Sequence, residues 1–146
     1  MFHPWRLERR SPGSFIVFIV DDEESVRKAF SLLLRSAGLP HRVFSSATQF
    51  LGDLDPQAEG CVLLDITMPQ VTGVELLKEL NQRKSRLRVI AISACDDAET
   101  GILARQLGAQ FFLRKPVDDQ ALIDAIHWVM GSDDNKRGQP APHSST

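Results

Sequence analysis

The 146-residue sequence has no long apolar stretch and few cysteines. Its longest purely apolar run covers only residues 15–20, whereas a membrane-spanning helix needs about 20 apolar residues. The N-terminal arginines have no apolar segment beside them, so no secretory signal is expected. Two cysteines, Cys61 and Cys95, are too few for a disulfide framework, and we expect reduced thiols in a cytoplasmic protein.

The sequence also lacks a large net charge and any phosphate-binding loop motif. A net charge of −2 and a pI near 6.1 lack the basic balance of a protein whose main partner is nucleic acid. The four histidines are scattered, without the spacing of metal ligands. Asp-Asp-Glu-Glu follows the first apolar run, where a dinucleotide-binding protein would have a glycine-rich turn, and no P-loop pattern occurs.

The length fits one domain, which we expect over residues 15–130, with flexible tails of mixed Pro, Gly, Ser and charge over 1–14 and 131–146. Between these tails, apolar runs alternate with segments of helical periodicity, and this pattern predicts a (βα)5 arrangement around a parallel sheet. The predicted strands are 15–20, 41–44, 61–65, 88–93 and 110–113.

The helices are predicted from apolar periodicity and from their start and stop residues. The first ends before Gly38 and turns one face inward, made of Val26, Ala29, Phe30, Leu33 and Ala37. The second follows Ser45 and Ser46, the third begins near Gly73, the fourth spans about 97–107, and the fifth starts at Asp118 and Asp119.

Polar residues follow the predicted strands at their carboxyl ends, where open α/β sheets bind ligands. Asp21 and Asp22 follow the first strand, Asp65 ends the third, Ser93 ends the fourth, and Lys115 comes shortly after the fifth. Three carboxylates brought together require protons or a hard divalent cation, and Mg²⁺ suits oxygen ligands. With a lysine and a hydroxyl nearby, the set indicates phosphoryl transfer to Asp65 as an acyl phosphate.

Each of these signals is weak alone. An Asp-Asp pair before a helix is as consistent with a favourable helix start as with a metal site. Asp65 is harder to dismiss, because ending a buried strand on an unpaired carboxylate is costly. Ser93 on its own reads as a strand-end cap.

The stretches IVDDEESVRKAF, LLDITMPQVTG, AISA and FFLRKPVDD resemble the receiver domains of two-component response regulators, most closely the NarL/FixJ type. The resemblance covers about residues 15–130. It implies a CheY-like, flavodoxin-like doubly wound sheet with strand order 2-1-3-4-5 and helices on both faces. It also implies a bacterial phosphorylation switch rather than an enzyme.

Position by position, the resemblance makes Asp65 the phosphoacceptor. It assigns Mg²⁺ or Mn²⁺ to Asp21, Asp22, Asp65 and the backbone carbonyl of Thr67. It further implies that Ser93 and Lys115 contact the phosphoryl group, and that the Lys115 to Pro116 peptide is cis.

The resemblance also assigns residues to switching and to phosphoryl lifetime. Ser93 and Phe112 match the switch pair, although Phe112 stands where many relatives have Tyr, and plain core packing is its other interpretation. Thr67 and Cys95 match the positions that tune lifetime, and since neither is an acid or an amide, their ability to orient an attacking water is doubtful.

The expected partners are a sensor histidine kinase or phosphotransfer protein and a downstream protein, with no nucleic acid or membrane contact by the domain itself. The downstream partner would bind the surface of the fourth helix, fifth strand and fifth helix, and a phosphorylation-dependent homodimer is a further expectation. Exposed candidates there are Arg105, Gln106, Arg114, His127 and Trp128, the last with partial burial at the helix end as its alternative.

Three other interpretations stay open. A haloacid-dehalogenase-type phosphatase also uses a strand-end aspartate and magnesium, but it expects a second aspartate where this sequence has Thr67. A degenerate receiver would bind partners without phosphorylation, which the intact acid, hydroxyl and lysine set disfavours. The chain is either a stand-alone regulator or the receiver portion of a longer transcriptional regulator.

Overall fold

A computed structural model describes residues 15–67, 73–94 and 98–131. Within these ranges strands and helices alternate strictly, as predicted. The strands are β1 (Ile16–Val20), β2 (His41–Phe44), β3 (Gly60–Asp65), β4 (Arg88–Ser93) and β5 (Phe111–Arg114). The helices are α1 (Glu24–Ser36), α2 (Ala47–Asp53), α3 (Gly73–Gln82), α4 (Ala98–Gln106) and α5 (Asp119–Gly131).

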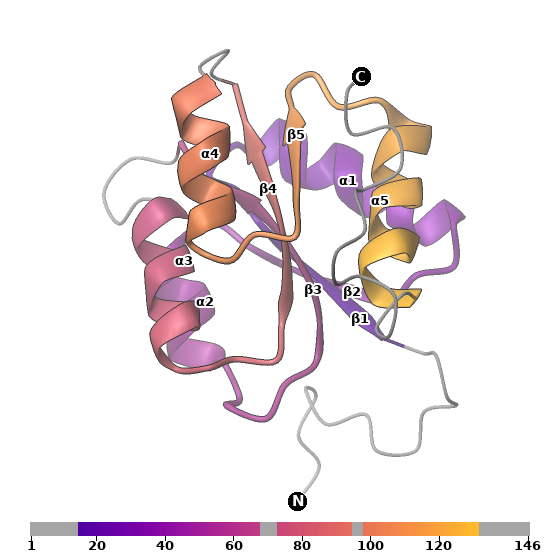
Figure 1. The fold of residues 1–146 in the computed structure, drawn as a ribbon. Coiled ribbons are helices and arrows are strands. Elements are labelled where there is room, and N and C mark those ends of the chain that lie inside the picture. Colours follow the sequence, from indigo (N-terminus) through magenta and orange to yellow (C-terminus); the bar gives the residue numbers. More distant parts are fainter. Residues whose placement is uncertain (1–14, 68–72, 95–97, 132–146) are drawn as a thin grey trace, which may run out of the picture.

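All strand pairs are parallel, and the order is β2-β1-β3-β4-β5, which confirms the implied topology. Helices α1 and α5 cover one face of the sheet, and α2, α3 and α4 cover the other (Figure 1). The strands β1 and β3 are buried along their whole length. Their unbroken apolar runs therefore fill two cores at once, one on each side of the sheet.

The inward face of α1 differs from the prediction in detail. Phe30 and Leu34, one helical turn apart, are the buried residues of this helix, and Val26 and Leu33 are partly buried beside them. Ala29 and Ala37 are exposed, so their assignment to the buried face was wrong. The large side chains set how the helix is turned, because burying them removes more apolar surface from water than burying alanine.

The helix ends follow the expected capping chemistry. Ser46 caps α2, since its hydroxyl accepts a hydrogen bond from the backbone N–H of Gln49 at 3.0 Å. The carboxylate of Asp118 accepts one from the N–H of Ala121 at 2.9 Å and so caps α5. Gly38 has a φ of +74°, the left-handed conformation that ends α1.

Gly73 brings the start of α3 directly against the chain that follows β3. A Cβ atom there would lie 2.4 Å from the carbonyl oxygen of Asp65 and 2.3 Å from the Cα of Ile66. Only glycine permits this approach, which fixes the helix next to the strand end where Asp65 lies. Among the described residues, no helix is long and apolar enough to cross a membrane.

Candidate functional site

Three carboxylates gather at the carboxyl ends of β1 and β3. These strands are neighbours in the sheet, with Val20 paired to Leu64, so Asp21 and Asp65 follow at the same edge. Ligand oxygens of Asp21, Asp22 and Asp65 lie within 4.8 Å of one another. Asp21 and Asp65 are buried, whereas Asp22 is exposed. An all-oxygen set of this kind, open on one side, fits a hard cation such as magnesium, and the acidic cluster that the sequence predicted is confirmed.

Asp21 is held from two directions. Its Oδ1 accepts a hydrogen bond from the N–H of Glu23 at 2.9 Å, and its backbone carbonyl accepts one from Nη1 of Arg27 at 2.8 Å. Burial raises the pKa of the Asp21 carboxyl above its ordinary value, the negative charge of Asp65 raises it further, and the Glu23 N–H and Lys115 oppose that rise. A cation beside Asp21 would therefore relieve an electrostatic cost that the fold imposes.

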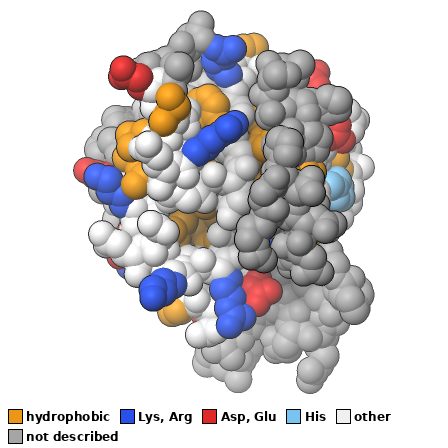
Figure 2. Space-filling model, viewed as in Figure 1, with side chains coloured by type: hydrophobic (Ala, Val, Ile, Leu, Met, Phe, Trp, Pro, Cys, Tyr) orange, Lys and Arg blue, Asp and Glu red, His pale blue; other side chains and the backbone are white. Residues whose placement is uncertain are grey.

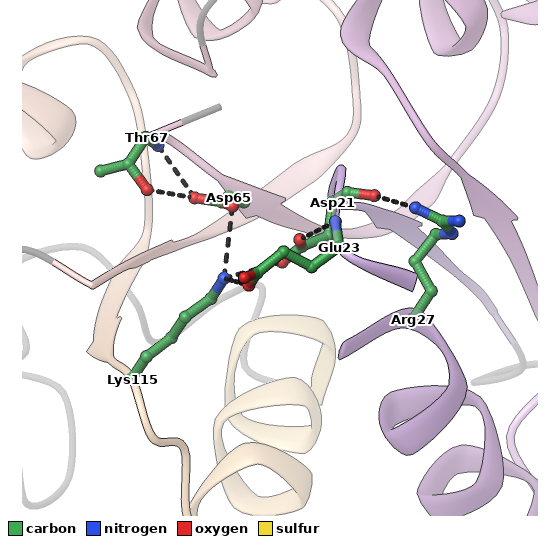
Figure 3. Close-up of polar contacts among 6 residues, drawn as sticks. All are labelled: Asp21, Glu23, Arg27, Asp65, Thr67 and Lys115. Carbon is green, nitrogen blue, oxygen red and sulfur yellow. Dashed lines mark hydrogen bonds and ion pairs between the residues drawn. The ribbon is translucent and has the colours of Figure 1, made fainter. Parts of the chain in front are cut away.

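Lys115 supplies the positive charge of the site (Figure 3). Its Nζ lies 3.1 Å from Oδ2 of Asp21, 3.3 Å from Oδ2 of Asp65 and 3.1 Å from Oε1 of Glu23. Burial disfavours the charged ammonium, but these carboxylates outweigh burial and raise the pKa of Lys115 above its usual value. The side chain is thus a fixed cation at the centre of an acidic cluster.

The backbone around Lys115 joins β5 to β4. Its N–H donates to the carbonyl of Ser93 at 2.8 Å, and the Lys115 to Pro116 peptide is cis, as the resemblance implied. The backbone of Lys115, just after β5, is thus anchored beside the last residue of β4, and its side chain reaches across the strand ends to Asp65.

Asp65 is also bound on its other oxygen. Oδ1 accepts hydrogen bonds from the backbone N–H of Thr67 at 2.9 Å and from the Thr67 hydroxyl at 2.7 Å. Both carboxylate oxygens of Asp65 are therefore engaged, one by Thr67 and one by Lys115. The roles of the Thr67 carbonyl as a metal ligand and of Thr67 in phosphoryl lifetime stay predictions.

Ser93 and Phe112 are the two residues that the resemblance assigns to switching. Ser93 is fully buried at the end of β4, one residue beyond the pair formed by Asp65 and Ile92. Phe112 is partly buried, and a Cβ atom on Gly101 of α4 would lie 3.5 Å from its ring. Their switching roles stay predictions, and Cys95 lies outside the described residues.

The predicted partner surface is partly apolar. Arg105, Gln106, Arg114 and His127 are exposed. Trp128 is partly buried, its ring centroid 6.0 Å from that of Phe111, as the alternative interpretation held. Sequence reasoning missed two large exposed apolar residues of α4, Ile102 and Leu103. Figure 2 shows hydrophobic and basic side chains side by side over the α4 part of the molecule.

Glu23 and Arg27 were also missed. Glu23 belongs to the acidic run after β1, but nothing in the sequence separates it from Glu24. Arg27 lies six residues after Asp21, and its contact depends on the direction in which α1 leaves the strand.

Comparison with known proteins agrees with this geometry. Residues 17–127 match the family model of the response regulator receiver domain. The sequence is 40% identical over 120 residues to the transcriptional regulatory protein FixJ of Azorhizobium caulinodans, covering 82% of this chain and 57% of that protein. It is 43% identical over 111 residues to the transcriptional regulatory protein TdiR of Thauera aromatica, covering 76% and 49%.

Solved structures give the same result. A structure titled FixJ-N is 31% identical, with a TM-score of 0.72 over 88% of this chain and 98% of that one. The response regulator StyR is 38% identical, with a TM-score of 0.75 over 81% and 60%. The chain spans about half the length of the curated relatives it matches. The fold, the acidic rim formed by Asp21, Asp22 and Asp65, and these matches together show that the chain belongs to the response regulator receiver domain family.

Proposed function

We propose that this domain is a phosphorylation switch in which Asp65 accepts a phosphoryl group from the phosphohistidine of a sensor kinase or phosphotransfer protein in the cytoplasm. The observation that carries the proposal is the pairing of buried Asp65 with the Nζ of Lys115 at the acidic rim. In the transfer, a carboxylate oxygen of Asp65 forms a bond to phosphorus while the P–N bond breaks. The electron pair of that bond returns to the imidazole nitrogen.

Mg²⁺ is the cation that best suits this rim, held by Asp21, Asp22, Asp65 and the carbonyl of Thr67. It would supply positive charge that offsets repulsion between the carboxylates and the incoming phosphoryl oxygens. Lys115 contributes a second positive charge, and the hydroxyl of Ser93 offers a donor to one phosphoryl oxygen. The domain positions and stabilises the group that it receives and is not an enzyme acting on other molecules.

The output would be a change of binding surface. Phosphorylation biases a two-state element in which Ser93 moves toward the phosphoryl group and Phe112 turns inward, and the surface of α4, β5 and α5 changes with them. The exposed apolar residues Ile102 and Leu103 support a protein partner there, which includes a second copy of the domain.

A second proposal concerns the whole protein. Several relatives carry the name transcriptional regulatory protein, and the chain matches about half of their length. We infer that this receiver works in the same setting, as the phosphorylated part of a transcriptional regulator, with DNA contact made outside the domain.

The direct test is labelling with radioactive acetyl phosphate in Mg²⁺, for the wild type, Asp65→Asn and Asp53→Asn. Asp53 is an exposed aspartate at the end of α2 and serves as the matched control. We expect label on the wild type and Asp53→Asn, none on Asp65→Asn, and none on any form after the metal is removed with EDTA. Equal labelling of the wild type and Asp65→Asn, or no label on either, would contradict the proposal.

A further inference from the structure

Glu23 occupies the N-cap position of α1 but does not cap the helix. Its backbone is extended, and its side chain accepts no hydrogen bond from the first turn. Instead the carboxylate reaches across the rim, where Oε1 lies 3.1 Å from the Nζ of Lys115 (Figure 3). A residue that stands where side chains usually satisfy helix N–H groups is thus directed at the lysine of the phosphorylation site.

The ammonium group of Lys115 is fully engaged by carboxylates. It has three protons to donate, and Asp21, Glu23 and Asp65 each have a carboxylate oxygen within 3.3 Å of its nitrogen. A phosphoryl oxygen that binds Lys115 must therefore take the place of one of these three. Lys115 itself is only 16% exposed, which limits the directions from which it can be approached.

Of the three carboxylates, that of Glu23 is the easiest to displace. Asp65 carries the phosphoryl group, and Asp21 is buried and held through its other oxygen by the N–H of Glu23. The Glu23 side chain is 58% exposed, so its carboxylate regains water when it leaves. After release it remains at the N-terminus of α1, where a negative charge is favourable.

We propose that Glu23 competes with the phosphoryl group for Lys115, holding the lysine in the unphosphorylated domain and yielding it when Asp65 is modified. This inference rests on the proposed function of Asp65. It makes Glu23 a positioning residue that lowers the affinity of the site for a phosphoryl group. The role of Glu23 then differs from that of Asp21 and Asp22, the proposed metal ligands.

Three variants isolate this contact. Glu23→Gln keeps the shape of the side chain and removes its charge. Glu23→Asp keeps the charge and removes the reach, because the chain is one methylene shorter. Glu24→Gln is the matched control. The Glu24 side chain is 70% exposed in the first turn of the same helix, and its Oε2 lies 3.4 Å from Nζ of Lys28, so it pairs with Lys28 and not with Lys115.

The main measurement is the affinity for beryllofluoride, a stable mimic of an acyl phosphate, titrated at saturating Mg²⁺ and followed by NMR. We expect Glu23→Gln and Glu23→Asp to bind it about two- to fivefold more tightly than the wild type, the range for losing a partly exposed ion pair. Glu24→Gln should bind with the wild-type affinity. Wild-type affinity in both Glu23 variants would overturn the inference.

Mg²⁺ affinity without beryllofluoride gives an independent measurement. We expect it to be the same in Glu23→Gln and Glu24→Gln, since Glu23 is not among the clustered metal ligands. A loss of Mg²⁺ binding in Glu23→Gln alone would make Glu23 a metal ligand and overturn the inference. If the wild type itself binds no beryllofluoride, the proposed function of Asp65 fails; if it binds and Glu23 has no effect, only the present inference fails.

Discussion

The guanidinium of Arg27 donates a hydrogen bond from Nη1 to the backbone carbonyl of Asp21 over 2.8 Å, so the first turns of α1 hold the end of β1 in place. This contact fixes the backbone of a buried aspartate whose carboxylate belongs to the acidic cluster.

Replacing Arg27 with Met should weaken Mg²⁺ binding by about three- to tenfold, because a charge-assisted hydrogen bond that positions Asp21 is lost. Lys28→Met is the control, since it removes the same charge one residue later from a side chain that is 73% exposed. Calorimetric titration with Mg²⁺ measures both affinities. Equal affinities in the two variants would show that Arg27 acts only through its charge.

Gly73→Ala should destabilise the domain by about 1–3 kcal/mol, the usual cost of forcing an atom into a packed site. The added Cβ would overlap the backbone at Asp65 and Ile66, and backbone cannot move aside as a side chain can. Gly52→Ala is the control, because a Cβ there meets nothing within 4 Å. Urea unfolding measures both, and we expect Gly52→Ala to be at least as stable as the wild type. A stable Gly73→Ala would mean that α3 can shift away from β3.

Gly101→Ala should have the opposite effect and stabilise α4. Alanine improves helix propensity by about 1 kcal/mol, and its Cβ would lie 3.5 Å from the ring of Phe112, an ordinary packing distance. We expect slower amide hydrogen exchange in α4 and unchanged exchange in α5. Faster exchange in α4 would show that the glycine is needed for Phe112 to lie against this helix.

Cys61 should be unreactive while the domain is folded. It is fully buried in β3, and burial raises the pKa of its thiol well above the ordinary value, against the opposing charge of Arg88. The thiolate is the reactive form, so little of it exists at pH 8. In a Cys95→Ser background, reaction with a disulfide reagent should be slow in buffer and fast in urea. Equal rates in both conditions would contradict the burial of Cys61.

The strands and the acidic rim could be predicted because they depend on chain order alone. A short, continuous apolar run marks a buried strand of a parallel sheet. The residue that follows the run must lie at the carboxyl end of that strand, the edge at which such sheets bind ligands. Asp21, Asp65 and Lys115 were found in this way, and the structure brings them together. The family resemblance added the cis peptide before Pro116, which no periodicity reveals.

Contacts that depend on how a helix is turned could not be predicted. Ala29 was assigned to the buried face of α1, while the packing of Leu34 decides that face. Glu23, whose backbone is extended just before α1, reaches Lys115, whereas Glu24 in the first turn of the helix pairs with Lys28, although the sequence presents the two glutamates as equivalent. These outcomes follow from side-chain volume and three-dimensional direction, which a linear pattern does not contain.

The alternation of side chains along the strands has one more consequence. Asp21 and Asp65 continue the series of β1 and β3 that pack toward α1 and α5, whereas Ser93 continues the β4 series facing α2, α3 and α4, as Phe112 does from β5. The side chains of the two acids and those of the two proposed switch residues therefore belong to opposite faces of the sheet. The two sides meet at the carboxyl ends of β3 and β4, so we expect a phosphoryl group on Asp65 to act on Ser93 and Phe112 there, while the core that packs against α1 and α5 stays as it is.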